Sequence, residues 1–265
     1  MPAALEIINA FATNPGTGPT FAATTLATGD TAQVRNFNAP SRTWLQDVWA
    51  LTTAAGAVRL RSPRLHDNVQ NLRWRTVAAT NRILDNVYTR QNLYAQDTII
   101  AELFGGAAET DCMAWMVYYE DLPGISARLV DLPTITPRIV NMLTVEIANT
   151  SGAAIGAYSA AAALNSFTDL LEANTDYAIL GYTSDTNGVS VGIRGPDTGN
   201  LRVGGPMTTE RIETRSIFAD MSVNYGVPCI PVINSANKGA TFVDNFQNIV
   251  GVAANIDLNL VQLHP

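Results

Sequence analysis

The sequence predicts an all-β protein, built from two β modules in tandem with a few short helices. Short runs of β-branched and aromatic residues recur between turn signals along the whole chain, at the spacing typical of β-sandwiches and barrels. A proline-rich stretch near the middle interrupts this rhythm, and a second series of runs begins after it. The chain has 265 residues, which is enough for one large β domain or for two smaller ones.

This division predicts four segments. We expect an N-terminal arm at 1–19, a first module at 20–122, a crossover at 123–138 and a second module at 139–265. Three prolines in the crossover prevent a continuous strand ladder or helix there. The two modules share no convincing residue-level repeat, so the evidence for a tandem arrangement is the order of the elements.

The composition is that of a globular chain that covers much of its surface with contacts. Apolar residues make up 47% of the chain and charged residues 15%, which excludes a disordered chain and a heavily solvated monomer. No apolar run reaches the roughly 20 residues of a membrane-spanning helix, and the N-terminus lacks the basic region of a signal peptide. We therefore expect a soluble chain without a secretion signal. Cys112 and Cys229 each stand alone in an apolar run, which predicts buried free thiols.

The charge is distributed unevenly between the two halves. Residues 1–130 contain 10 arginines and 11 acidic residues, whereas residues 131–265 contain 6 basic and 12 acidic residues; the net charges of −1 and −6 sum to −7. The basic residues are 15 arginines and one lysine, Lys238. Arginine is preferred over lysine in forked, stacked and interfacial contacts, so this bias favours contacts with protein.

In the first module, strands are expected where apolar residues cluster between turn signals. Phe21–Leu26 is predicted to pair with Ala32–Phe37 across a turn at 28–30. Strands are also expected at Thr98–Leu103 and Cys112–Tyr119. The second of these is apolar on both faces, as a central strand covered from both sides should be.

The stretch VRLRSPRLHDNVQNLRWR concentrates positive charge in this module. In its two predicted strands arginines alternate with apolar residues, which places Arg59, Arg61, Arg73 and Arg75 on one sheet face. Nucleic acid binding requires cations that are not opposed by acids, but the chain as a whole repels phosphate. We therefore interpret this face, together with Arg64, as a subunit interface, with a solvated strand face as the alternative.

In the second module the strand pattern begins again. Strands are predicted at Ile139–Ile147, Tyr177–Tyr182, Val189–Ile193, Val227–Ile233 and Ala254–Leu263. In the first part of the last strand, apolar Ile256, Leu258 and Leu260 alternate with polar Asp257 and Asn259. This closing strand is therefore the best candidate to complete the second module.

Three segments break the β pattern. Ser41–Ala54 spaces its apolar residues as a helix does, although a strand is possible for so short a run. The stretch SFTDLLEA from Ser166 resembles a capping box that opens a short helix. Thr208–Asn224 has a helical apolar stripe, and Gly226 is suited to end that helix.

No catalytic, metal or cofactor site is predicted. The motif GVSVG around Ser190 matches a nucleophile elbow, but the GIRGPDTGN stretch cannot form the helix that an elbow requires after its serine. Ser190 is therefore expected on the polar face of a strand, and the chain is expected to be enzymatically inert. His66-Asp67-Asn68 is interpreted as a loop, and 185–188 as a hairpin turn.

Several features together point to a known family. They are the two tandem β modules, the proline-rich crossover, the helices before late strands, and the closing strand that runs to the last residues. The stretches RLRSPRLHDNVQ, VYYEDLPG, LLEANTDYAILGY and RGPDTGNLRVGGP add to the likeness. The chain resembles the small double jelly-roll major capsid proteins of tailless icosahedral bacteriophages, over nearly its whole length and without a short diagnostic motif.

The resemblance implies two tandem jelly-roll modules, a homotrimer, and assembly with other capsid proteins into a virion shell made in the host cytoplasm. It also implies an internal membrane, which the N-terminus could contact, and no sequence-specific binding of nucleic acid. Because MPAALEIINAF carries no basic residue, its apolar side chains could instead lie on a neighbouring subunit.

Two other classes of protein fit the same pattern. One is a fibre, decoration or adaptor subunit of a tailed phage. The other is a carbohydrate-binding jelly roll, in which Trp44, Trp49 or Trp74 would stack on sugars. All four tryptophans, including Trp115, lie in apolar contexts, which favours core positions.

Overall fold

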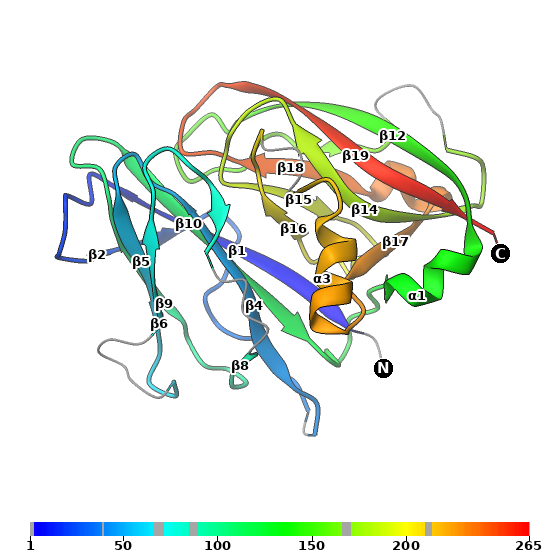
Figure 1. The fold of residues 1–265 in the computed structure, drawn as a ribbon, viewed down its shortest axis with the longest axis horizontal. Helices are drawn as coiled ribbons and strands as arrows, with labels where there is room; N and C mark the ends of the chain where they lie inside the picture. The colour runs from blue at the N-terminus through cyan, green and yellow to red at the C-terminus, as the bar shows by residue number, and fades with distance from the viewer. Residues whose placement is uncertain are drawn as a thin grey trace.

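The computed structural model describes residues 3–38, 40–65, 72–84, 90–165, 171–209 and 214–264. The protein is all-β, with two β-sandwich modules side by side and a few short helices (Figure 1). The predicted fold class is confirmed. Within the described ranges, no helix has the length and apolar character needed to cross a membrane.

The first module consists of two antiparallel sheets. The central sheet has the order β3-β1-β10-β4-β7, with β8 also paired to β4, and the β5 sheet has the order β2-β9-β5-β6. The central sheet contains β1 (Ala4–Thr13), β3 (Thr25–Leu26), β4 (Thr43–Leu51), β7 (Arg82–Ile83), β8 (Gln91–Asn92) and β10 (Thr110–Tyr119). The β5 sheet contains β2 (Ala22–Ala23), β5 (Gly56–Arg61), β6 (Leu72–Thr76) and β9 (Ile100–Phe104).

The second module also consists of two antiparallel sheets. The β19 sheet has the order β11-β17-β14-β19-β12, and the β15 sheet has the order β13-β18-β15-β16. The β19 sheet contains β11 (Leu129–Val130), β12 (Ile139–Thr150), β14 (Asp176–Ser184), β17 (Ile230–Asn234) and β19 (Ala253–Leu263). The β15 sheet contains β13 (Ala162–Ala163), β15 (Ser190–Arg194), β16 (Val203–Pro206) and β18 (Phe242–Phe246). The described helices are α1 (Leu132–Ile135), η1 (Thr136–Arg138), α3 (Ile217–Tyr225) and η2 (Ser235–Ala240).

Both modules have the same strand order. When the strands of each module are counted along the chain, one sheet joins the first, eighth, third and sixth, as β1-β10-β4-β7 and as β12-β19-β14-β17. The other sheet joins the second, seventh, fourth and fifth, as β2-β9-β5-β6 and as β13-β18-β15-β16. This arrangement of eight strands in two sheets is the jelly roll. Three short strands are additions to this arrangement and are left out of the count: β3 and β11 at sheet edges, and β8, which pairs with β4 beside the main path of the sheet.

The central sheet is buried on both faces, which explains why β4 and β10 are buried at every residue. Along β10, even-numbered side chains such as Met116 join the large core of the second module. Odd-numbered side chains such as Trp115 join the core beneath the β5 sheet. The run CMAWMVYY is apolar on both faces for this reason, as predicted.

The expectation of an N-terminal arm is wrong. Ala4–Thr13, assigned to an arm, forms β1, which pairs along its whole length with β10. Leu5, Ile7 and Ile8 are buried in the cores of their own chain, so they are not available to a membrane or a neighbouring subunit. For Ser41–Ala54, where the spacing indicated a helix and a strand was left open, the strand is correct, because Thr43–Leu51 is β4. Its apolar residues lie on both faces of a doubly covered strand, and this pattern imitates helical spacing.

The predicted hairpin at 21–37 is also wrong. Phe21–Leu26 is divided between β2, which pairs with β9, and β3, which pairs with β1, so the chain changes sheet at Thr24. Ala32–Phe37 forms no strand and contributes one isolated bridge, Gln33 with Thr98. The crossover contains β11, α1 and η1, which are short elements compatible with its prolines.

The other expected strands are confirmed with boundaries shifted by a few residues. The predicted helix at Thr208–Asn224 is confirmed in its second half as α3, and Gly226 ends it in the left-handed conformation. In β19, Ile256, Leu258 and Leu260 are buried. The helix expected from Ser166 and the His66-Asp67-Asn68 loop lie outside the described residues.

Candidate functional site

The four strand arginines lie together, as predicted. On the outer face of the β5 sheet, Arg59 is directly opposite Arg73, and Arg75 is opposite Ala57 on the neighbouring strand. Trp74 points the other way and packs on the core. We call the four residues Arg59, Arg61, Arg73 and Arg75 the arginine face. Arg64 lies in the following loop, where its Nη1 donates to the Ala95 carbonyl at 3.4 Å.

One carboxylate lies within the arginine face. Glu102 on β9 accepts from the Nε of Arg59 at 2.6 Å and from the Nε of Arg61 at 2.9 Å. Burial acts to raise the pKa of Glu102, but the hydrogen bonds from Arg61 and Arg59 outweigh it and hold the pKa below its usual value. Glu102 therefore offsets one of the four positive charges of the arginine face and is shared by Arg59 and Arg61.

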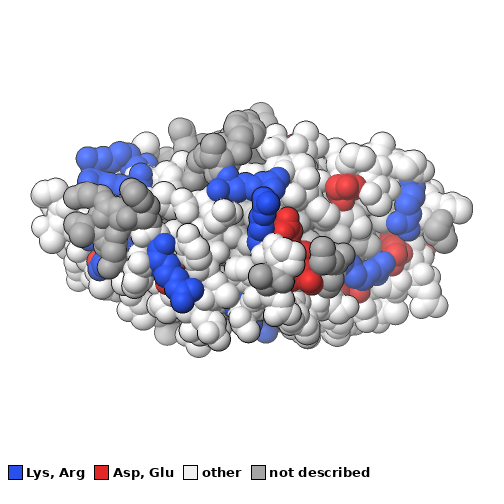
Figure 2. Space-filling model, turned by 90° about the horizontal axis from the view of Figure 1, so that it is seen from below, with Lys and Arg blue, Asp and Glu red and all other residues white. Residues whose placement is uncertain are grey.

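Arg73 and Arg75 occupy the exposed part of the same face. The guanidinium of Arg73 lies 5.0 Å from the centre of the Phe21 ring, and that of Arg59 lies 4.3 Å from it. These cation–π contacts hold the guanidinium groups of Arg59 and Arg73 near the Phe21 ring. On the surface shown in Figure 2, the end formed by the β5 sheet shows mainly basic side chains, whereas acidic and basic side chains are interspersed over the rest of this face.

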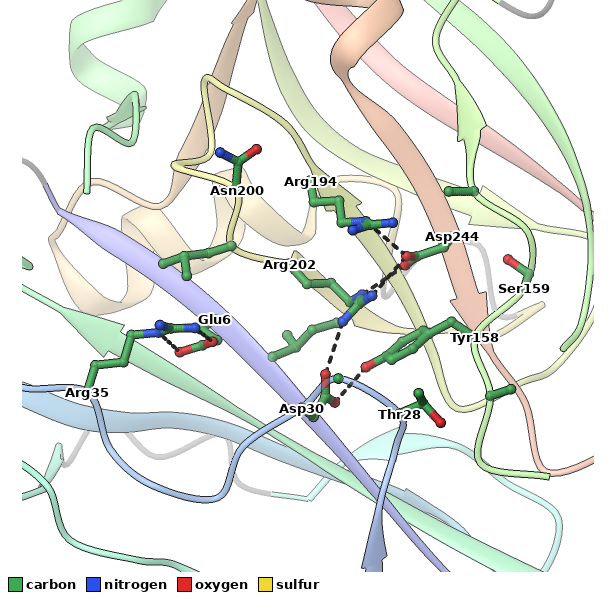
Figure 3. Close-up of a pocket in the computed structure, with 15 residues that line it drawn as sticks. Glu6, Thr28, Asp30, Arg35, Tyr158, Ser159, Arg194, Asn200, Arg202 and Asp244 are labelled. Atoms are coloured by element: carbon green, nitrogen blue, oxygen red, sulfur yellow. Dashed lines mark hydrogen bonds and ion pairs between the residues drawn. The ribbon is translucent and has the colours of Figure 1, made fainter. Parts of the chain in front are cut away.

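A second charged cluster lies between the two modules, and the sequence did not indicate it. Arg202, next to β16, donates from Nε and Nη2 to Asp244 at 3.0 Å each, and from Nη1 to Asp30 at 3.0 Å (Figure 3). Its guanidinium carbon lies 3.5 Å from the centre of the Tyr158 ring. We call Asp30, Tyr158, Arg202 and Asp244 the junction cluster, because Asp30 belongs to the first module and the other three to the second.

A chain of hydrogen bonds extends this cluster across the junction. Tyr158 donates to Asp30 at 2.6 Å and accepts from the amide of Asn9 at 2.7 Å. The hydroxyl of Ser190 donates to the side-chain oxygen of Asn9 at 2.8 Å. Ser190 lies on a strand, as expected, but it is fully buried and not on an exposed polar face. Through its hydrogen bond to Asn9, Ser190 links the second module to the first.

The junction cluster borders a cavity of about 420 Å³, which also contacts Glu6, Arg35 and Arg194. Burial raises the pKa of Asp30 to about 6, although the hydrogen bonds from Tyr158 and Asn9 and the charge of Arg202 act against it. Burial acts to lower the pKa of Arg202, but the hydrogen bond to Asp244 together with the charges of Tyr158, Asp244 and Asp30 outweighs burial, and the pKa is raised. Arg202 therefore remains charged at any pH at which the protein folds.

The chemistry of this junction is that of a structural contact. Each carboxylate at the cavity is paired with an arginine. Across the described residues, no three His, Cys, Asp or Glu side chains are arranged to hold a metal ion. The cluster has almost no signal in the sequence, because its members are separated by up to 214 positions along the chain. The Thr-Gly-Asp turn that ends at Asp30 is its one local feature.

The tryptophans and cysteines are where the sequence places them. Trp44, Trp49 and Trp115 are buried, and the indole of Trp49 donates to the Val189 carbonyl at 2.7 Å across the module junction. None of these three rings is available to stack on a sugar. Cys112 and Cys229 are buried free thiols.

Comparison with known proteins finds no family model and no curated protein that matches the chain. Among solved structures, the PBSX exported protein XepA is similar over 97% of this chain and 86% of its own, with 11% sequence identity and a TM-score of 0.26. The STIV MCP is similar over 100% of this chain and 98% of its own, with 10% identity and a TM-score of 0.23. Likenesses at such low TM-scores carry no functional conclusion.

Proposed function

We propose that the chain is a structural subunit of a virion, the major capsid protein that assembles with copies of itself and with other capsid proteins into an icosahedral shell. The observation that carries this proposal is the jelly-roll strand order, present twice in one chain and joined by a polar junction. The jelly roll is a common fold of capsid proteins, and it also occurs in lectins. Function inferred from fold is an analogy, so it requires a direct test of assembly.

The arginine face is proposed as one of the subunit contacts. Arg73 and Arg75 are exposed at one end of the molecule, and residues 131–265 carry the acidic excess of −6 that a neighbouring copy could present to them. Such a contact would desolvate arginines, which are enriched in protein interfaces. A homotrimer is the expected product.

The test is the mass and shape of the purified chain. We expect native mass spectrometry to give three copies and negative-stain microscopy to show compact trimers or shells. Replacing Arg73 and Arg75 by Gln should weaken the oligomer while the β-type circular dichroism is retained. A stable monomer at micromolar concentration would contradict the proposal, and extended fibres would favour the tailed-phage alternative.

We also propose that the subunit has no enzymatic activity. Ser190, the one residue in a nucleophile-like motif, is buried and donates its hydrogen bond to Asn9. A nucleophile needs an exposed oxygen and an adjacent base. Esterase turnover that is lost in a Ser190→Ala variant with intact fold would contradict this proposal.

A further inference from the structure

The outer face of the β19 sheet brings two like charges together. Glu146 on β12 is directly opposite Asp257 on β19, and Thr183 on β14 completes the row. Asp185 lies one row away, where it accepts from the backbone and side-chain amides of Asn255 at 2.9 and 2.8 Å. Carboxylates directly opposite each other on neighbouring strands repel. Within the described ranges, neither Glu146 nor Asp257 has an ion pair.

The opposite end of the molecule has the same arrangement with the opposite sign. On the arginine face, Arg59 and Arg73 are directly opposite each other on neighbouring strands. The β5 sheet and the β19 sheet are the outer layers of the molecule, because the central sheet and the β15 sheet lie between them (Figure 1). Arg59 is bonded to Glu102, so the uncompensated positive charge of the β5 sheet lies at Arg73 and Arg75, whereas the β19 sheet carries a repulsive carboxylate pair.

We propose that the acidic face, formed by Glu146, Asp257 and Asp185, is the surface that receives the arginine face of a second copy of this chain. Each face supplies the charge that the other lacks, so the contact offsets the excess positive charge at Arg73 and Arg75 and the repulsion between Glu146 and Asp257. The inference rests on the proposed function in taking another copy as the partner. It adds the surface on which that copy docks.

This contact uses two different surfaces of the same chain, and it is therefore heterologous. A heterologous contact joins copies head to tail and gives a closed ring if the rotation between copies closes. A ring of three copies satisfies every arginine face and every acidic face. Since the charged groups lie at the surface, the association should weaken as the salt concentration rises.

A charge reversal on the acidic face tests the proposal. In Glu146→Arg, the docked copy would meet a cation in place of a carboxylate, and we expect the dissociation constant of the oligomer to rise by about tenfold or more in sedimentation velocity. The matched control is Glu109→Arg, which makes the same charge change at an exposed position outside the acidic face. The control should associate like the wild type. Circular dichroism verifies the fold of each variant.

A compensating variant makes the test specific. Arg73→Glu alone should also weaken association, and Arg73→Glu combined with Glu146→Arg in one chain should restore at least part of it. If Arg73→Glu weakens association while Glu146→Arg behaves like its control, the acidic face is not the partner surface, and the proposed function stands. If neither variant changes association, the result contradicts both proposals, that the acidic face is the docking surface and that the arginine face is a subunit contact.

Discussion

Arginine has two different environments in this protein. In the junction cluster, the Arg202 side chain is 14% exposed, and its partners Asp30 and Asp244 are 4% and 1% exposed. On the arginine face, Arg73 and Arg75 are exposed and make no ion pair in the described part of the chain. One arginine joins the two modules, whereas the others are available to contact another molecule.

From this difference we infer that an arginine contributes more to the stability of the folded subunit when the carboxylates around it are buried. Removing Arg202 would leave buried Asp30 without a cation and buried Asp244 with only the half-exposed Arg194 at 3.5 Å, and a buried charge without close compensation is costly. Removing an exposed arginine leaves nothing buried, and exposed charges contribute little to folding. The junction cluster should therefore determine subunit stability, and the arginine face should determine assembly.

The largest effect is expected for Arg202→Met. The substitution retains apolar contact with the Tyr158 ring but leaves Asp30 and Asp244 without a cation between them. We expect the free energy of unfolding to fall by about 3 to 5 kcal/mol, measured by urea denaturation.

The control for this prediction is Arg194→Met. Arg194 approaches the same Asp244 at 3.5 Å, but its side chain is 46% exposed. Its loss should cost less than about 1 kcal/mol. Equal losses in the two variants would contradict the role of burial at the junction.

The second largest effect is expected in the pH dependence of the free energy of unfolding, through the titration of Asp30. Because its folded pKa of about 6 lies above the ordinary 3.8, the folded state binds the proton more tightly than the unfolded state. Asp30 therefore adds stability as the pH falls from about 7 to about 4. The free energy of unfolding of the wild type, relative to that of Asp30→Asn, should rise by about 2 kcal/mol over this range.

The comparison with Asp30→Asn removes the contribution of other titrating groups, because these are common to both proteins. The groups that face Asp30 are Arg202 and Tyr158 from the second module and Glu6 from β1. A difference in stability that is independent of pH would show that the carboxyl of Asp30 titrates normally.

The sequence predicted one of the two arginine regions and missed the other for a physical reason. Arg59, Arg61, Arg73 and Arg75 alternate with apolar residues on adjacent strands, and period-two alternation places side chains on a common face without knowledge of the rest of the fold. The contacts of Arg202 with Asp30 and Asp244 depend on how two modules pack. No local pattern encodes that packing.

Whether a strand is covered on one face or on both faces explains which strands could be predicted from the sequence. Strands with one covered face, such as β5 and β19, alternate in sequence and were predicted. The segment of β4 stayed ambiguous between helix and strand because the central sheet is covered on both faces, which removes the alternation. The strand β1 was read as an arm, since a sequence alone does not show that a second module covers it.

A smaller effect is expected for Glu102→Gln, on the arginine face. The substitution removes a carboxylate that is 9% exposed and bonded to Arg59 and Arg61, so we expect a loss of about 1 to 2 kcal/mol at neutral pH. Because the folded pKa of Glu102 is lowered, this contribution is present above the ordinary pKa and is lost as the pH falls through the folded value. The wild type and Glu102→Gln should converge in acid, which is opposite in direction to the trend of Asp30. Divergence in acid would contradict the assignment.

The smallest effect on stability is expected for Arg75→Gln. Arg75 is exposed on β6 opposite Ala57, and no aromatic ring contact or ion pair holds it in the described part of the chain. Its substitution should change the free energy of unfolding by no more than about 0.5 kcal/mol. Arg73→Gln should cost slightly more, because Arg73 also lies over the Phe21 ring. If the arginine face is a subunit contact, Arg75→Gln will nevertheless weaken the oligomer in light scattering at unchanged subunit stability. A subunit destabilised by several kcal/mol, with its oligomer intact, would mean that the arginine face supports the fold and not the assembly.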